Sequence, residues 1–197
     1  MSEIVQFDKY RHVRAAPPLV FVDMVRHEID PEPGFGEAES GPVLARCRQL
    51  LREARSRHWP IAFVRSAMRS VPGFASAGAR WIDGFEPRRC DMVFERHGAS
   101  CYSSDEFARA MDAAGRVYIV AGFSADNSCL ATLMDAPLNN HFVGVVQDAA
   151  ATRPLPGLDA AESHRAVIAV SSRYATILST EHWIDVAVGA TIGAARA

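Results

Sequence analysis

Residues 117–136 read VYIVAGFSADNSCLATLMDA, and this stretch decides the fold that we expect. Its first six residues form a largely apolar run, which is typical of a strand buried on both faces of a parallel sheet. A turn follows Gly122, and Leu130, Leu133 and Met134 then repeat at the spacing of a helix. Because a helix N-terminus directs backbone N–H groups and positive partial charge at a bound group, this turn is a candidate binding element.

Apolar runs of the same kind recur along the chain, separated by segments with helical spacing. The runs are rich in Val, Ile and Phe and cover residues 18–24, 60–66, 91–96, 116–122, 141–149 and 175–180. Residues 43–54, 107–114 and 164–171 place apolar side chains on one helical face. Ser103 to Glu106 reads S-x-x-E, which predicts a capping box. The alternation implies right-handed crossovers and an α/β, doubly wound (Rossmann-like) parallel sheet of about six strands with helices on both faces.

The composition is that of an ordinary globular protein. The chain has 197 residues, of which 49% are hydrophobic and 22% charged, which favours a single domain over residues 1–197 with residues 1–16 as an N-terminal arm. The net charge of −2 gives no reason to expect nucleic acid or an anionic membrane as partner. No apolar run approaches the ~20 residues of a membrane span. The N-terminus lacks a signal-peptide core, and the four cysteines lack disulfide spacing, so we expect a cytoplasmic protein with reduced thiols.

Residues at the ends of the predicted strands are the first candidates for a site, because ligands bind there in doubly wound sheets. The strand ends supply Asp23, Ser66, Arg96, the turn over residues 122–129, and Asp148. A desolvated Asp23 would suit general acid/base chemistry, and the alternatives are an N-cap or an ion pair with Arg96. Cys129 at a helix entry could be a nucleophile, but a buried cysteine is more often a small hydrophobic residue.

The order of these motifs resembles that of the isochorismatase-like (cysteine hydrolase) family, from about residue 17 to residue 183. The shared features are a strand ending in Asp23, a D-x-V-x-x-basic strand ending at Arg96 with S-x-aromatic after it, and a Gly–turn–Cys helix closing in T-x-x-D-A. The resemblance implies that Asp23 is the acid/base group. It also places Arg96 at the position of the catalytic lysine and Ser128 at that of the nucleophilic cysteine, with Cys129 one residue later.

The departures from the family pattern bear on mechanism. The Ser128-Cys129 register is that of the isochorismatase branch, which hydrolyses a vinyl ether with the aspartate as acid and without a covalent nucleophile. One step along a helix rotates a side chain by ~100°, so Cys129 cannot simply replace a nucleophile at the previous position. Ser128 could line the site or act as a weak nucleophile with Asp23 as base. Arginine stays protonated, so Arg96 can anchor an anion but cannot shuttle a proton.

Other family features are absent. Val25 stands where a glutamine is common, and Lys9, the only lysine, could replace the catalytic lysine only if the arm folded over the site. The D-x-H pattern of the family's nicotinamidases is missing between residues 66 and 91, and no two histidines have ligand spacing, so we expect no metal. The first strand lacks G-x-G-x-x-G, and we expect no cofactor. For residues 67–80 we expect a surface loop or a loop over the site.

Two functions fit these observations. The first is a hydrolase of a small carboxylate-bearing amide, carbamoyl compound or enol ether, with Asp23 as acid/base and Arg96 as anchor. The second is an inactive relative that serves as a small-molecule-binding or regulatory module. The resemblance suggests a homo-oligomer in either case. We expect Asp23, Arg96 and Ser128 to converge at the carboxyl ends of the strands, with the Asp23 carboxylate close to Arg96.

Overall fold

One parallel sheet organises the computed structural model, which describes residues 16–29, 35–67 and 80–195. Its strand order is β3-β2-β1-β4-β5-β6, and every neighbouring pair is parallel. The strands are β1 (Leu19–Val22), β2 (Ile61–Ser66), β3 (Met92–Arg96), β4 (Val117–Gly122), β5 (Phe142–Ala150) and β6 (Thr176–Leu178). This confirms the predicted doubly wound α/β sheet. Most of the predicted arm (1–16) and of the predicted loop (67–80) lies outside the described residues.

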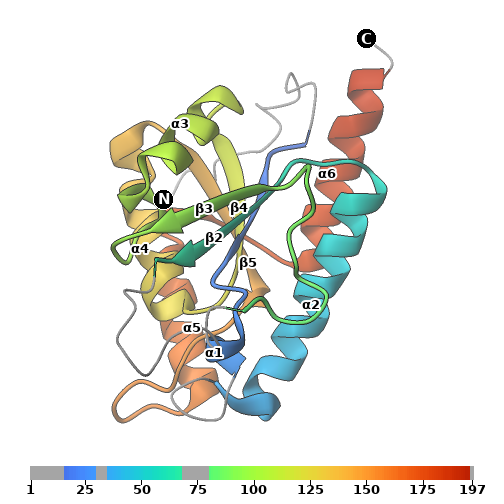
Figure 1. Cartoon of the computed structure of the whole chain (residues 1–197). Coiled ribbons are helices and arrows are strands. Elements are labelled where there is room, and N and C mark those ends of the chain that lie inside the picture. Colours follow the sequence, from blue (N-terminus) through green and yellow to red (C-terminus); the bar gives the residue numbers. More distant parts are fainter. Residues whose placement is uncertain (1–15, 30–34, 68–79, 196–197) are drawn as a thin grey trace.

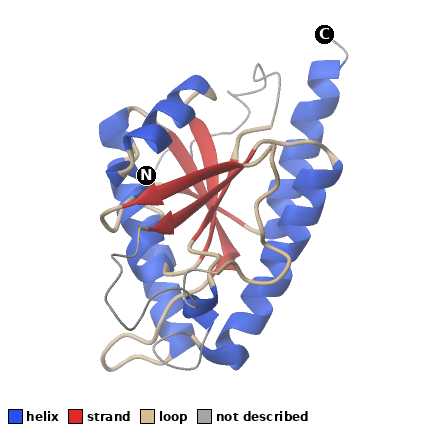
Figure 2. Cartoon of the chain, viewed as in Figure 1, coloured by secondary structure: helices blue, strands red, loops and turns tan. Residues whose placement is uncertain are grey.

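Helices cover both faces of the sheet (Figures 1 and 2). The helices are α1 (Arg26–Ile29), α2 (Gly36–Ser56), α3 (Asp105–Ala113), α4 (Leu130–Asp135), α5 (Ala160–Ser171) and α6 (Thr180–Ala195). The two long helices α2 and α6 pack on one face, whereas α3, α4 and α5 pack on the other. No described helix is long and apolar enough to span a membrane.

The core follows from strand periodicity. Alternate side chains of β1 point to opposite faces, so Leu19 and Phe21 join the core under α2 and α6, whereas Val20 and Val22 join the core under α3 to α5. All four are fully buried. The edge strand β3 departs from the predicted burial on both faces, because Val93 is 46% exposed. Within the described residues, β3 is covered only on its face towards α3, where Phe94 packs edge-on against the ring of Phe107.

The predicted capping box at Ser103 and Glu106 is wrong. Helix α3 begins at Asp105 after Ser104, and residues Cys101–Ser103 form a 3₁₀ turn. Because this turn connects β3 to α3, the Ser103 hydroxyl accepts N–H groups of His97 and Gly98 (3.1 and 2.8 Å) instead of capping the helix. A complete capping box does exist at the start of α5, between Asp159 and Glu162.

Close backbone approach marks the centre of the sheet, where the strand order reverses between β1 and β4. Gly122 ends β4 with φ +124°, and a Cβ added to it would lie 2.2 Å from the carbonyl oxygen of Val22. The next residue, Phe123, donates its N–H to the same oxygen (2.9 Å). Only glycine fits this position, which brings the ends of β1 and β4 together at the point where doubly wound sheets bind ligands.

Substitution of Gly122 by alanine should therefore be far more destabilising than strain alone would make it. Gly115→Ala is the matched control, because Gly115 also has a positive φ (+99°) but no atom within 4 Å of an added Cβ. In the control, the free energy of unfolding should fall by the cost of a strained backbone, about 1–3 kcal/mol. In Gly122→Ala, the free energy of unfolding measured by urea denaturation should fall by at least about 2 kcal/mol more than in the control. Equal losses in the two variants would contradict a steric role for the close approach.

Candidate active site

Asp23 lies directly after β1, in a backbone conformation that is unusual for a residue with a side chain. Its φ of +51° is left-handed, and its N–H donates to the carbonyl of Val64 (2.8 Å). The side chain is buried, and its Oδ1 accepts the backbone N–H of Ser66 at the end of β2 (3.2 Å). Such strained residues cluster at functional sites, which makes Asp23 a candidate on geometry alone.

Arg96, the last residue of β3, brings the candidate residues together. Its Nη2 donates to Asp23 Oδ2 and to Ser128 Oγ, the latter at 2.7 Å, and its Nη1 donates to the carbonyl of Gly98. The side chains of Arg96 and Asp23 are only 8% and 3% exposed, so the ion pair is buried. Removing one partner of such a pair would leave an uncompensated charge in the interior. The expected convergence of Asp23, Arg96 and Ser128 at one edge of the sheet is observed.

The two residues at the helix entry point in different directions. Residues Ala125–Cys129 form a π-helical turn that begins after Ser124, whose φ is +52°. Ser128 is directed at Arg96, whereas the thiol of Cys129 donates towards the carbonyl of Phe123 at 3.5 Å. Burial raises the pKa of the Cys129 thiol well above its ordinary value. Ser128 therefore faces Arg96, whereas Cys129 packs in the core.

The other strand-end candidates do not join this site through their side chains. Ser66 contributes its backbone N–H to Asp23. Asp148 lies within β5 rather than at its end, and its Oδ1 accepts the N–H and the hydroxyl of Thr180 (2.8 and 3.0 Å). It therefore fixes the start of α6. His97 is exposed, and Lys9 lies outside the described residues.

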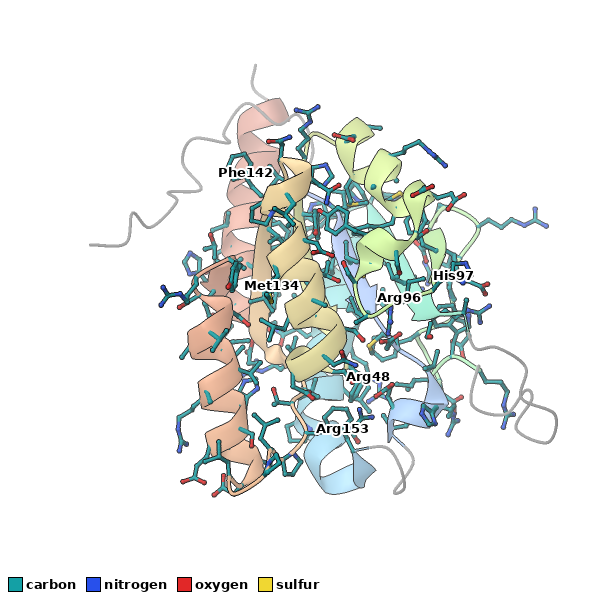
Figure 3. All side chains as sticks on the ribbon, turned by 90° about the vertical axis from the view of Figure 1, so that its left-hand side faces the viewer. Arg48, Arg96, His97, Met134, Phe142 and Arg153 are labelled. Carbon is teal, nitrogen blue, oxygen red and sulfur yellow. The ribbon has the colours of Figure 1, made fainter. Side chains whose placement is uncertain are left out.

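A second ion pair at the same turn was not found from the sequence. Arg153 Nη2 donates to Glu28 Oε2 (2.8 Å), and Arg153 Nη1 donates to Ser124 Oγ (3.3 Å). The guanidinium also lies over the ring of Phe35, 4.7 Å from its centroid. Figure 3 labels both arginines, and their hydrogen bonds to Ser124 and Ser128 place Arg153 at the start of the π-helical turn and Arg96 near its end. The sequence feature that could have identified Arg153 is its position shortly after β5, since Asp23 likewise follows β1.

Glu28 is a carboxyl group whose pKa is raised. Burial raises its pKa above the ordinary value, the charge of Arg153 counteracts this rise, and the charge of nearby Asp23 adds to it. The site thus combines two carboxylates, two guanidinium groups and two serine hydroxyls. Among the residues described, no group of three His, Cys, Asp or Glu side chains could hold a metal ion. The arrangement suits proton transfer and the binding of polar or anionic groups.

The sequence profile of the isochorismatase domain matches residues 17–182. The chain belongs to the isochorismatase family. No curated protein sequence matches it.

Solved structures of this family share the fold. An isochorismatase from Pseudomonas putida superposes with a TM-score of 0.77 and 23% identity, over 85% of this chain and 90% of that chain. A cysteine hydrolase from Pseudomonas syringae gives 0.78 and 17%, over 90% and 94% of the two chains. A putative hydrolase of the isochorismatase family from Chromobacterium violaceum gives 0.75 and 22%, over 96% and 100%.

The buried thiols generate a chemical prediction. Burial raises the pKa of Cys101 to about 12, and it also raises the pKa values of Cys47 and Cys129. Because the thiolate is the reactive species, these three residues should alkylate slowly at pH 7, and the exposed Cys90 should react first. Iodoacetamide labelling followed by peptide mass spectrometry measures this. A Cys90→Ser variant that still labels rapidly at Cys129 would restore a cysteine mechanism.

Proposed function

We propose that this chain is an isochorismatase-like hydrolase that cleaves a small molecule with Asp23 as the acid/base group and without a covalent thiol step. The observation that carries the proposal is the contact of Arg96 with both Asp23 and Ser128. It supports a site whose reactive groups are a carboxylate, a guanidinium and a hydroxyl. The substrates would be small amides, carbamoyl compounds or enol ethers, with a carboxylate as the anionic group.

In this proposal Asp23 begins the reaction as a general base. Asp23 accepts hydrogen bonds from the adjacent guanidinium and from the Ser66 N–H, and in this proposal it takes a proton from a water molecule that attacks the substrate carbonyl. The C–O bond to water forms, the carbonyl oxygen becomes an oxyanion, and the C–N bond then breaks. Asp23 returns the proton to the leaving nitrogen, which restores the resting carboxylate. An enol ether would instead require Asp23 to donate a proton at the start of the reaction.

Arg96 would supply electrostatic stabilisation. A guanidinium stays charged at all relevant pH values and donates from a planar fork, so it can hold an oxyanion or a carboxylate but cannot relay a proton. Its Nε is buried and has no hydrogen-bond partner among the described residues. Ser128 would orient the substrate, since its Oγ already accepts a hydrogen bond from Arg96.

A second candidate is an inactive relative that binds a small molecule. One observation favours it: both terminal nitrogens of Arg96 are already engaged by Asp23, Ser128 and Gly98. An arginine held in this way can stabilise the fold of a protein that has no catalytic activity. The two candidates differ in whether the wild type has any hydrolytic activity.

The domain organisation, the location and the oligomeric state are also proposals. We propose one hydrolase domain over residues 1–197, supported by a sheet and core that include residues from Ala16 to Ala187. We further propose a cytoplasmic homo-oligomer that acts on a small-molecule substrate without metal or cofactor. The exposed apolar side chains of Met134 and Phe142, both labelled in Figure 3, and of Leu138 support a contact between copies.

Substitutions at the ion pair test the hydrolase. Asp23→Asn should lower kcat by about 100-fold or more on whichever amide, carbamoyl compound or enol ether the wild type cleaves. Arg96→Lys keeps the charge but loses the fork, and it should lower kcat/KM by about tenfold or more. Arg57→Lys, in a surface ion pair with Glu53, is the control and should change neither value. Undiminished turnover by folded Asp23→Asn would rule out its acid/base role.

A double variant separates the adapted enzyme from the inactive relative. Arg96→Lys with Ser128→Cys restores a lysine and places a thiol where Ser128 now contacts residue 96. If the chain is an inactive relative, the double variant should hydrolyse simple amides while the wild type releases no product from any substrate in the panel. If the chain is an adapted enzyme, the wild type should turn over and Arg96→Lys should lose that activity. Product release assayed by liquid chromatography on the wild type, Arg96→Lys and the double variant distinguishes these outcomes.

A further inference from the structure

Thr132 is a buried polar residue of α4 that has no role in the proposed reaction. It lies four residues after Ser128 and is fully buried. Its hydroxyl makes two hydrogen bonds: it donates to the carbonyl of Ser128 (2.8 Å) and accepts the backbone N–H of Cys101 (2.9 Å). Because both contacts are buried, this one hydroxyl satisfies a backbone acceptor and a backbone donor in the interior.

The two hydrogen bonds differ in what they indicate. A threonine within a helix often donates to the carbonyl four residues before it, so the bond to Ser128 alone would indicate only a local helical contact. The bond from Cys101 instead joins α4 to a segment 31 residues away in the sequence. Cys101 begins the 3₁₀ turn that connects β3 to α3. Thr132 therefore links the π-helical turn to the connection that follows Arg96.

These contacts form a closed ring around Ser128. Arg96 is the last residue of β3, and its Nη2 donates to the Ser128 hydroxyl (2.7 Å). Further along the same connection, Cys101 donates to Thr132, whose hydroxyl donates to the Ser128 carbonyl. The side chain and the backbone of Ser128 are thus both held by the segment that begins at Arg96. A site residue keeps its geometry only when the groups around it are themselves fixed, so both points of attachment matter.

We infer that Thr132 is a positioning residue, whose hydroxyl fixes the backbone of Ser128 so that its side chain faces Arg96. The inference rests on the proposed function for the use of this contact in a reaction, but the geometry itself can be measured without turnover. Loss of the hydroxyl would deprive the Cys101 N–H and the Ser128 carbonyl of these partners in the interior, and both segments would shift to find others.

Substitutions at Thr132 separate the hydroxyl from the rest of the side chain. Thr132→Val keeps the shape and removes both hydrogen bonds, whereas Thr132→Ser keeps the hydroxyl and removes only a methyl group. Thr132→Ala also removes the hydroxyl but leaves room for a water molecule, and it serves if Thr132→Val does not fold. Thr180→Val is the matched control, because Thr180 is equally buried and its hydroxyl donates to Asp148 (3.0 Å) at the start of α6, on the opposite face of the sheet from α4.

A thiol at position 128 would report its contact with Arg96. Ser128→Cys combined with Cys90→Ser gives one thiol that titrates near its ordinary range, because burial raises the pKa values of the other three. The guanidinium of Arg96 lowers the pKa of a thiol that it contacts, and the carboxylate of Asp23 on the same guanidinium raises it. The ultraviolet absorbance of the thiolate measures this pKa, after subtraction of the titration of the Cys90→Ser protein.

The pKa of this thiol should rise by about one unit or more when Thr132→Val or Thr132→Ala is added, because the thiol no longer faces the guanidinium. Thr132→Ser and Thr180→Val should leave it unchanged. A constant pKa in both hydroxyl-free variants would overturn the inference. An equal rise in Thr180→Val would also overturn it, since the cause would then be a general loss of stability rather than the hydroxyl of Thr132.

Turnover of Thr132 variants with the native Ser128 and Cys90 tests the hydrolase separately. On whichever substrate the wild type cleaves, Thr132→Val should lower kcat by about tenfold or more and Thr132→Ser should restore most of it, because a small misplacement of site groups slows a reaction. A shifted thiol pKa without wild-type turnover would support the role of Thr132 and count against the hydrolase. Wild-type turnover with an unshifted thiol pKa would support the hydrolase and overturn the role of Thr132.

Discussion

Asp23 and Arg96 carry opposite charges that are buried together at the carboxyl edge of the sheet, although their strands are not neighbours. β2 lies between β1 and β3, so Arg96 reaches across the end of β2, whose Ser66 N–H also binds Asp23. Neither charge could be buried alone without a cost of several kcal/mol. The ends of three strands and the π-helical turn are therefore fixed relative to one another by one ion pair.

This ion pair also limits the chemistry. A lysine at position 96 could exchange a proton with Asp23, but the guanidinium keeps its protons and so leaves Asp23 as the only group at this contact that can transfer one. The turn adds a second limit, because the thiol of Cys129 is buried against the carbonyl of Phe123. The water-dependent reaction that we propose agrees with both limits, whereas a thioester intermediate does not.

The sequence predicted those features that depend on local pattern. Runs rich in Val, Ile and Phe identified the strands, and the order of Asp23, Arg96 and Ser128 at strand ends identified their convergence, because parallel strands end at one edge. The capping box at Ser103 failed because its hydroxyl binds N–H groups of the β3–α3 connection, a tertiary constraint that the S-x-x-E pattern does not contain. Glu28 and Arg153 were missed because their pairing joins residues 125 positions apart.

The two ion pairs act on opposite ends of the same short turn. Glu28 and Arg153 hold Ser124 before the turn, while Asp23 and Arg96 hold Ser128 within it. Ser124 keeps a left-handed backbone that an isolated chain would rarely adopt, so contacts at both ends must stabilise this conformation. Because the turn is fixed at each end, the choice of Ser128 rather than Cys129 as the residue facing Arg96 is a property of the fold. A change at either ion pair must then alter the turn that both share, which makes their effects non-additive.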